Sequence, residues 1–180
     1  MKTKNTEECN GKPVSEQGLC GIYAVALTTN KTVQSVFNKY KRYYQMGNDW
    51  KGATKYGHIF NLLMLYKRKI RLIIAPKTDF SKGSGKPVSL RKFVDEYSGK
   101  NRTYIIRYRG HIMVVLNRIC YDQHGKTPYE SIGKPIDIIE RVSRWSGNTY
   151  KQYIGGQKNA LVTNAMEITN SLFKPPINNN

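Results

Sequence analysis

The chain is predicted to be an α+β domain, with N-terminal helices packed on a C-terminal antiparallel sheet. In its first half, apolar residues recur at the three- and four-residue spacing of helices. From Arg102 onward they follow the period of two that is typical of strands. Helices first and strands second is the order of an α+β fold, because a parallel α/β sheet alternates the two.

Length and composition predict one globular domain without cofactors. The chain has 180 residues, enough for one domain with a core. Its three cysteines, Cys9, Cys20 and Cys120, are an odd number without C-x-x-C spacing, so we expect no disulfide framework and no structural zinc site. The motifs of the chain imply no other metal and no cofactor. No signal segment opens the chain and no apolar run reaches the roughly 18 residues of a membrane span, so we expect a cytoplasmic protein and no membrane partner.

The charge balance favours negatively charged partners. Thirty Lys and Arg against twelve Asp and Glu leave a net charge of +18. Such an excess attracts polyanions, so association with nucleic acid or an acidic protein is one expectation. The alternative is a solvated surface without a partner. A sequence-specific nucleic-acid reader is disfavoured, because the chain has no helix-turn-helix spacing, zinc-ligand pattern or RNP motif.

Two helices are predicted after a polar, aperiodic segment, residues 1–16, which we expect to form a loose arm. The first begins at Cys20 and the second after Thr32, which can cap it. The apolar residues at helical spacing are Leu19, Ile22, Tyr23, Ala26 and Leu27 in the first helix and Val33, Val36, Phe37, Tyr40 and Tyr44 in the second. A loop at 46–57 follows, with Trp50 as its expected anchor.

The third predicted helix spans residues 58–69 and ends in a basic cluster, which suits the negative end of a helix dipole. A strand at 71–75 and a flexible loop at 77–87 follow. Ser89 is then expected to cap a short helix at 90–97.

The predicted sheet begins with strands at 103–108, 111–116 and 119–122, and a further strand is expected at 138–145. The segment 159–173 is ambiguous between helix and strand. The predicted organisation is therefore an arm at 1–16, a domain at 17–145 and a C-terminal extension of uncertain structure at 146–180.

Cys20 is the candidate nucleophile. It follows Gly18 and Leu19 at the predicted start of a helix, where unpaired backbone N–H groups and the helix dipole favour a thiolate. The same N–H groups can stabilise the oxyanion that forms when a thiolate attacks a carbonyl. The alternative is a core cysteine, because free cysteine is among the most buried residue types.

His111 and Asp122 are the candidate partners of this thiol. His111 opens an apolar strand directly after Gly110. If residues 117–118 form a two-residue hairpin loop, His111 and Asp122 lie on the same face of neighbouring strands. A carboxylate there can orient an imidazole and stabilise its protonated form. The alternatives are a core histidine and a turn aspartate, and Asn117 and Asp137 are weaker candidates for the orienting role.

These residues together resemble the papain-like cysteine proteases, and most closely in pattern the small papain-like proteins of tailed phages. Three segments carry the match. Residues 19–24 contain Cys-Gly after a leucine, residues 104–115 contain Arg-Gly-His before apolar residues, and residues 120–122 end in Tyr-Asp. Residues 141–145 are similar to the closing strand, so the resemblance covers residues 17–145. It implies a cysteine peptidase with Cys20 as nucleophile, His111 as general base and acid, and Asp122 as orienter. For a phage-encoded protein the resemblance implies a location in the host cytoplasm, or association with the virion.

The oxyanion donor departs from that family. Such relatives often carry Asp or Asn before the nucleophile, where this chain has Leu19, and papain's glutamine corresponds to Val14. The nearest side-chain amide is Gln17, which is the predicted oxyanion donor. The spacing of Gln17 and Cys20 also resembles that of the ovarian-tumour-type deubiquitinases.

Two functional hypotheses follow from the sequence. The first is a thiol hydrolase, most simply a cysteine peptidase that acts on a protein or peptide by acyl transfer. The second is a papain-like binding module without catalysis, directed by its basic surface to nucleic acid or an acidic host protein.

Overall fold

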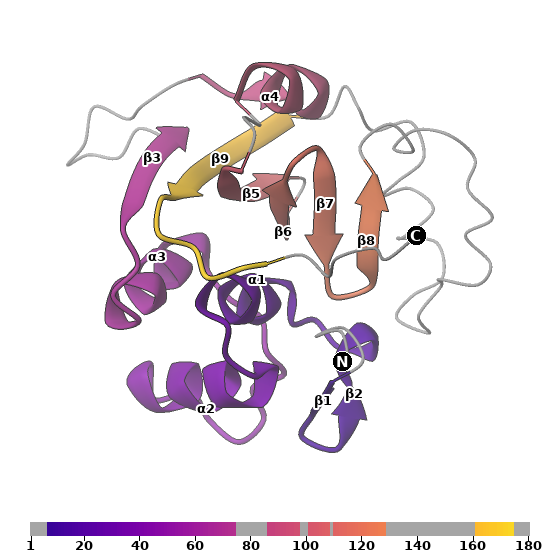
Figure 1. Ribbon diagram of the computed structural model, residues 1–180. Coiled ribbons are helices and arrows are strands. Elements are labelled where there is room, and N and C mark those ends of the chain that lie inside the picture. The colour runs from indigo at the N-terminus through magenta and orange to yellow at the C-terminus, as the bar shows by residue number, and fades with distance from the viewer. Residues whose placement is uncertain (1–6, 75–85, 98–100, 109, 129–160, 175–180) are drawn as a thin grey trace.

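The computed structural model describes residues 7–74, 86–97, 101–108, 110–128 and 161–174, and these residues form an α+β fold, as the sequence predicts (Figure 1). The helices are α1 (Cys20–Thr29), α2 (Val33–Tyr43), α3 (Tyr56–Leu65) and α4 (Leu90–Tyr97). The strands are β1 (Glu8–Cys9), β2 (Lys12–Pro13), β3 (Ile70–Ile74), β4 (Val88–Ser89), β5 (Thr103–Tyr108), β6 (His111–Leu116), β7 (Ile119–Asp122), β8 (Gly125–Pro128) and β9 (Leu161–Ile168).

The main sheet separates two hydrophobic clusters. Its described strands are antiparallel in the order β3-β9-β5-β6-β7-β8, and β4 also pairs with β9. Helices α1, α2 and α3 cover one face, and α4 covers the other (Figure 1). No described helix is long and apolar enough to cross a membrane.

Helix α1 lies at the centre of the first cluster. The predicted inward residues are all buried, and so is every residue from Gly21 to Thr29. A helix that is apolar on all sides needs neighbours on all sides. Here the sheet supplies one wall, and α2 and α3 supply the others.

The predicted α2 is confirmed. The Ser35 N–H donates to the hydroxyl of Thr32 at 3.2 Å, so Thr32 is the cap. The predicted stripe is buried from Val33 to Tyr40. Trp50 anchors the following loop as expected, because its ring stacks on those of Phe37 and Tyr40 with centroids 4.7 Å away in each case.

Helix α3 is shorter at its end than predicted. It begins at Tyr56 and ends at Leu65, so the basic residues 67–69 follow the helix instead of forming its last turn. The chain leaves the helix at Lys67, which has a φ of 56°. The Arg68 guanidinium then donates to the backbone carbonyl of Asn170 at 2.7 Å, which ties this turn to the C-terminal segment.

The N-terminal segment is not the loose arm that its polarity suggests. From Glu7 onward it forms the β1–β2 hairpin and a short 3-10 helix, and it buries Cys9 and Val14 completely. The Glu7 carboxylate accepts from the Val33 N–H at 2.8 Å, at the start of α2. Two isolated apolar side chains produce no periodicity, so the sequence pattern could not indicate this packing.

The predicted strands at 103–108, 111–116 and 119–122 are confirmed at both ends as β5, β6 and β7. Asn117 and Arg118 have φ angles of 50° and 62°, and Leu116 pairs with Ile119. The loop therefore has the two residues that the hairpin argument assumed. Ser89 also caps α4 as predicted, since its hydroxyl accepts from the Lys92 N–H at 3.2 Å.

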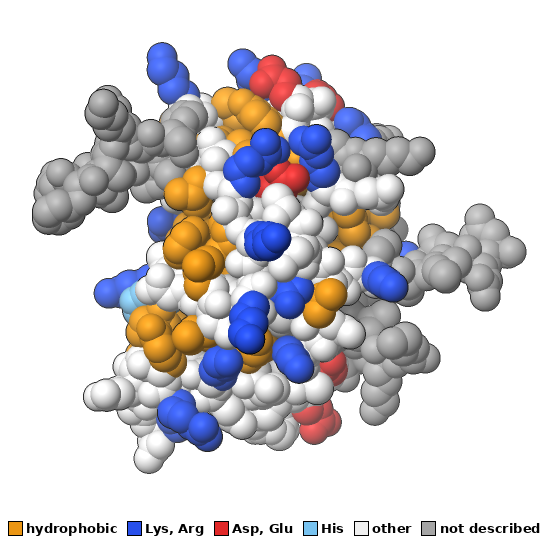
Figure 2. All heavy atoms as spheres, turned by 60° about the vertical axis from the view of Figure 1, so that its left-hand side comes forward, with side chains coloured by type: hydrophobic (Ala, Val, Ile, Leu, Met, Phe, Trp, Pro, Cys, Tyr) orange, Lys and Arg blue, Asp and Glu red, His pale blue; other side chains and the backbone are white. Residues whose placement is uncertain are grey.

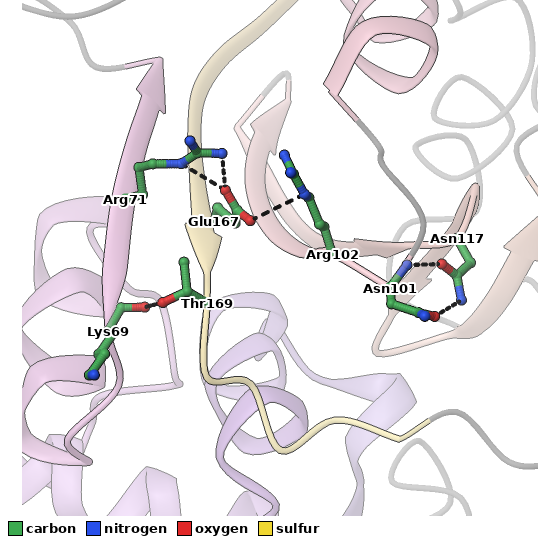
Figure 3. A network of polar contacts seen from close by, with 7 residues as sticks. All are labelled: Lys69, Arg71, Asn101, Arg102, Asn117, Glu167 and Thr169. Carbon is green, nitrogen blue, oxygen red and sulfur yellow. Dashed lines mark hydrogen bonds and ion pairs between the residues drawn. The ribbon is translucent and has the colours of Figure 1, made fainter.

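The C-terminal segment is a central part of the fold, which corrects its interpretation as an extension of the domain at 17–145. Strand β9 lies between β3 and β5 and pairs with both. Glu167 accepts from Arg71 on β3 and lies 3.9 Å from Arg102 beside β5 (Figure 3). Residues 164–168 are buried on both faces of the sheet, so they lack the alternation that marks a half-exposed strand.

Some predictions fall outside the described residues. These are the strand at 138–145 with its resemblance at 141–145, Asp137, and almost all of the loop at 77–87.

Candidate active site

Cys20 is the first residue of α1, as the sequence predicts. The first helical bond runs from the Tyr23 N–H to the Leu19 carbonyl at 2.8 Å. The N–H groups of Cys20, Gly21 and Ile22 precede this bond, so they have no acceptor within the helix. The thiol thus lies beside the positive end of the helix dipole.

Two glycines bring the loop at 46–55 against this turn. A Cβ at Gly21 would lie 2.0 Å from Oγ1 of Thr54, and one at Gly52 would lie 2.1 Å from the Leu19 side chain. Gly52 also has a φ of 99°, which favours glycine. The loop therefore fixes the start of α1 through contacts that leave no room for a side chain.

Gly21→Ala is expected to destabilise the protein by about 1–3 kcal/mol, because the new methyl group overpacks against Thr54 and Ile59. Gly57→Ala is the matched control. Gly57 is also in a helix, but its Cβ would meet nothing within 4 Å, so this change should stabilise by at most about 1 kcal/mol. Urea unfolding of both variants measures the difference. Equal effects would contradict the close packing at Gly21.

His111 and Asp122 are in contact, as the hairpin argument predicts. Nε2 of His111 lies 3.1 Å from Oδ2 of Asp122, and the side chains are only 10% and 14% exposed. The other carboxylate oxygen accepts from the His124 N–H at 2.9 Å. Since an ionised carboxylate only accepts, Nε2 carries a proton. Nδ1 is therefore the nitrogen that faces other partners.

The Cys20 thiol shares a side-chain hydrogen bond with the His111 ring. It also accepts from the backbone N–H groups of Ile112 and Gly21. Backbone N–H groups alternate between the two sides of a strand, so the N–H of Ile112, like that of Leu116, points toward β7. The β6–β7 pairing reaches only to Val114, so this N–H is available to the sulfur near the plane of the sheet.

These contacts favour a charged Cys20–His111 pair. Burial raises the pKa of the Cys20 thiol, but the hydrogen bond and charge of His111 and the two backbone N–H groups lower it by more. Burial lowers the pKa of His111, but the hydrogen bonds and charges of Asp122 and Cys20 raise it to about 9. Burial raises the pKa of Asp122, but its hydrogen bond with His111 and the nearby positive charge bring it below its usual value. The group can therefore hold a thiolate, an imidazolium and a carboxylate together.

The structure places the Gln17 amide away from this site, which corrects its assignment as the oxyanion donor. Its Nε2 donates to the backbone carbonyls of Cys9 and Lys12 at 2.9 Å and of Pro13 at 3.2 Å. Gln17 thus holds the β1–β2 hairpin against the loop before Cys20. The backbone N–H groups at the start of α1 are the remaining candidates for an oxyanion donor.

Gln123 is a residue that the sequence analysis missed. It is 1% exposed, and its Nε2 donates to the Gln17 carbonyl, so it connects the turn after Asp122 to the chain that leads into Cys20. Its Oε1 is buried without a partner among the described residues. Nothing distinguishes Gln123 from an ordinary turn residue in the sequence, because its role depends on two distant segments.

The other two histidines have different surroundings. Burial lowers the pKa of His124 and the positive charge of His111 lowers it further, although Asp122 acts in the opposite direction. The positive charge therefore resides on His111. His58 stacks on Tyr44 with ring centroids 3.8 Å apart, and its Nδ1 lies 2.8 Å from the Tyr40 hydroxyl, so it belongs to the aromatic packing around α2.

The remaining candidate, Asn117, lies at the hairpin turn and not at the site. Its side chain accepts from the Asn101 N–H at 2.7 Å (Figure 3).

Within the described part of the chain, no three His, Cys, Asp or Glu side chains are grouped as a metal site requires. Comparison of the chain with family models, with curated proteins and with solved structures finds no match in any of the three.

Proposed function

We propose that this protein is a thiol hydrolase of the papain-like kind, a cysteine peptidase or a related acyl-transfer enzyme. The observation that carries the proposal is the contact of three side chains: Cys20 at the start of a helix, His111 against its thiol, and Asp122 against the imidazole. Cys-His hydrolases need this arrangement, because the base activates the nucleophile and a third group orients the base. The chain order also supports a papain-like protein, with Cys20 on an N-terminal helix and the two partners on later strands.

In the first step, the Cys20 thiolate attacks the carbonyl carbon of a peptide or ester bond, and a C–S bond forms. The carbonyl oxygen becomes an oxyanion, which backbone N–H groups at the start of α1 stabilise. The His111 imidazolium donates its Nδ1 proton to the leaving amine or alcohol, and the bond to that group breaks. Asp122 remains ionised and holds Nε2.

In the second step, His111 is neutral and acts as a base. It takes a proton from water, and the hydroxide oxygen attacks the thioester carbon. The C–S bond then breaks, the acid leaves, and the thiolate and imidazolium are restored. Besides the substrate and water, both steps use side chains and backbone groups of this chain.

The test is alkylation with iodoacetamide as a function of pH, followed by mass spectrometry of each cysteine. We expect the alkylation rate of Cys20 to reach its plateau at a lower pH than that of an ordinary thiol, because its pKa is lowered by His111 and by two backbone N–H groups. Cys9 is the internal control, since burial first and Glu7 second raise its pKa to about 11. Cys120 is also buried.

His111→Ala should give Cys20 the pH profile of an ordinary thiol, with the rate still rising toward pH 9. His58→Ala, the matched histidine control, should leave the profile unchanged. A wild-type Cys20 that already has the ordinary profile would overturn the proposal.

A second candidate is a binding module for a polyanion, and the net charge of +18 favours it. Lys and Arg side chains are spread over the face on which β3 lies, with few Asp and Glu among them (Figure 2). Such a surface attracts nucleic acid or an acidic protein. This function needs no ionised thiol, so the alkylation profile of Cys20 separates it from the hydrolase.

A further inference from the structure

A row of residues crosses the sheet beside Cys20, on the face that α1 covers. Ile112 on β6 pairs with Arg107 on β5, which in turn pairs with Asn164 on β9. Cross-strand partners stand about 5 Å apart and share a face. The Ile112 N–H contacts the Cys20 sulfur on the β7 side of β6, and Arg107 pairs with Ile112 from the β5 side. One residue of β6 therefore separates Arg107 from the proposed nucleophile.

Arg107 is the exposed member of this row. The other residues of β5 are buried, whereas Arg107 is open to solvent. It forms no ion pair with any described residue, unlike Arg71 and Arg118. Burial raises the pKa of Tyr56 and the charge of Arg107 lowers it, so the guanidinium lies near this tyrosine at the start of α3. Tyr56 packs on the same cluster as Cys20.

Asn164 provides an amide next to Arg107. The residue is 7% exposed, and its Oδ1 accepts from the neighbouring Thr163 hydroxyl at 3.3 Å. The β5–β9 register shifts between Arg107 and Tyr108. Such irregularities are common next to functional sites, because they redirect a side chain and interrupt the pairing.

We propose that Arg107, with Asn164 beside it, forms a substrate subsite that binds a carboxylate, so that the enzyme prefers acidic peptide segments. The inference rests on the proposed hydrolase. A guanidinium holds a carboxylate by two parallel hydrogen bonds, and an adjacent amide can donate to the same group. The net charge of +18 attracts acidic segments to the protein before they bind.

The experiment compares two alkylating probes that differ only in charge. Both are N-iodoacetyl amino acids with an amidated α-carboxyl group: one is glutamate, with a free side-chain carboxylate, and the other is its isostere glutamine. Each forms an S–C bond with Cys20 and releases iodide, and each carries its side chain beyond the reacting carbon. We expect the glutamate probe to react with wild-type Cys20 about tenfold faster, the factor that a charge-assisted hydrogen bond provides. Arg107→Gln should remove most of this preference, which is measured as the ratio of the two alkylation rates.

Arg42→Gln is the matched control, because it removes the same charge from an exposed position on α2. It should preserve the preference for the glutamate probe. If the preference came only from the net positive charge of the protein, both variants would lower it equally. Equal ratios in Arg107→Gln and Arg42→Gln would overturn the subsite. A wild-type Cys20 that reacts with neutral iodoacetamide along the pH profile of an ordinary thiol would instead overturn the hydrolase itself, so the two failures are distinguishable.

Discussion

Cys20→Ala is expected to abolish hydrolysis of fluorescein-labelled casein and of 4-nitrophenyl acetate, a loss of at least about a thousandfold. The variant removes the sulfur that forms the covalent intermediate, and no other described thiol can replace it, since Cys9 and Cys120 are buried. The fold should persist, because the change removes one atom at a partly buried position where α1 begins. Release of fluorescent peptide and of nitrophenol measures the activity, and circular dichroism measures the fold.

Cys120→Ala is the matched control for that experiment. Cys120 packs in the cluster under α4, on the other face of the sheet from α1. Its loss should lower the stability slightly and leave turnover unchanged. Activity that survives in a folded Cys20→Ala variant would exclude Cys20 as the nucleophile.

The second large effect is expected at Asp122. Asp122→Asn should lower turnover severely, and Asp122→Ala should lower it further. Both variants remove the negative charge that helps raise the pKa of His111 to about 9. The two carboxylate oxygens of Asp122 accept from the His111 ring and from the His124 N–H. An asparagine keeps one of these oxygens and so can serve one of the two donors, whereas alanine serves neither.

The pH profile of turnover separates this role from a structural one. In the wild type, turnover should rise as Cys20 ionises and fall as His111 loses its proton near pH 9, because a neutral imidazole cannot protonate the leaving group. Without the Asp122 charge the pKa of His111 falls, so the descending limb should move to lower pH. Asp95→Asn, at an exposed aspartate that pairs with Arg118, should leave both limbs in place. Wild-type turnover in Asp122→Ala would show that Asp122 does not orient His111.

The sequence predicted those parts of the protein that depend on local rules. The Cys20 helix and the α2 stripe follow from a helical period, and the ends of β5, β6 and β7 follow from alternation and turn residues. The pairing of His111 with Asp122 was predictable for the same reason. The two residues are eleven apart in the sequence, on strands that one two-residue turn joins. The number of residues in this turn determines that their side chains lie on the same face of the sheet.

Only the tertiary structure decided the features that join distant segments. Strand β9 is buried on both faces, so its pattern does not distinguish strand from helix, and its place between β3 and β5 comes from pairing across most of the chain. Gln17 stands three residues from Cys20, yet its amide faces the N-terminal hairpin, because the loop's direction depends on what packs behind it. Arg107 is one arginine among many in the sequence, and only the register of the sheet pairs it with Ile112, the residue after His111. Periodicity specifies which residues are buried within an element, whereas long-range packing specifies which elements meet.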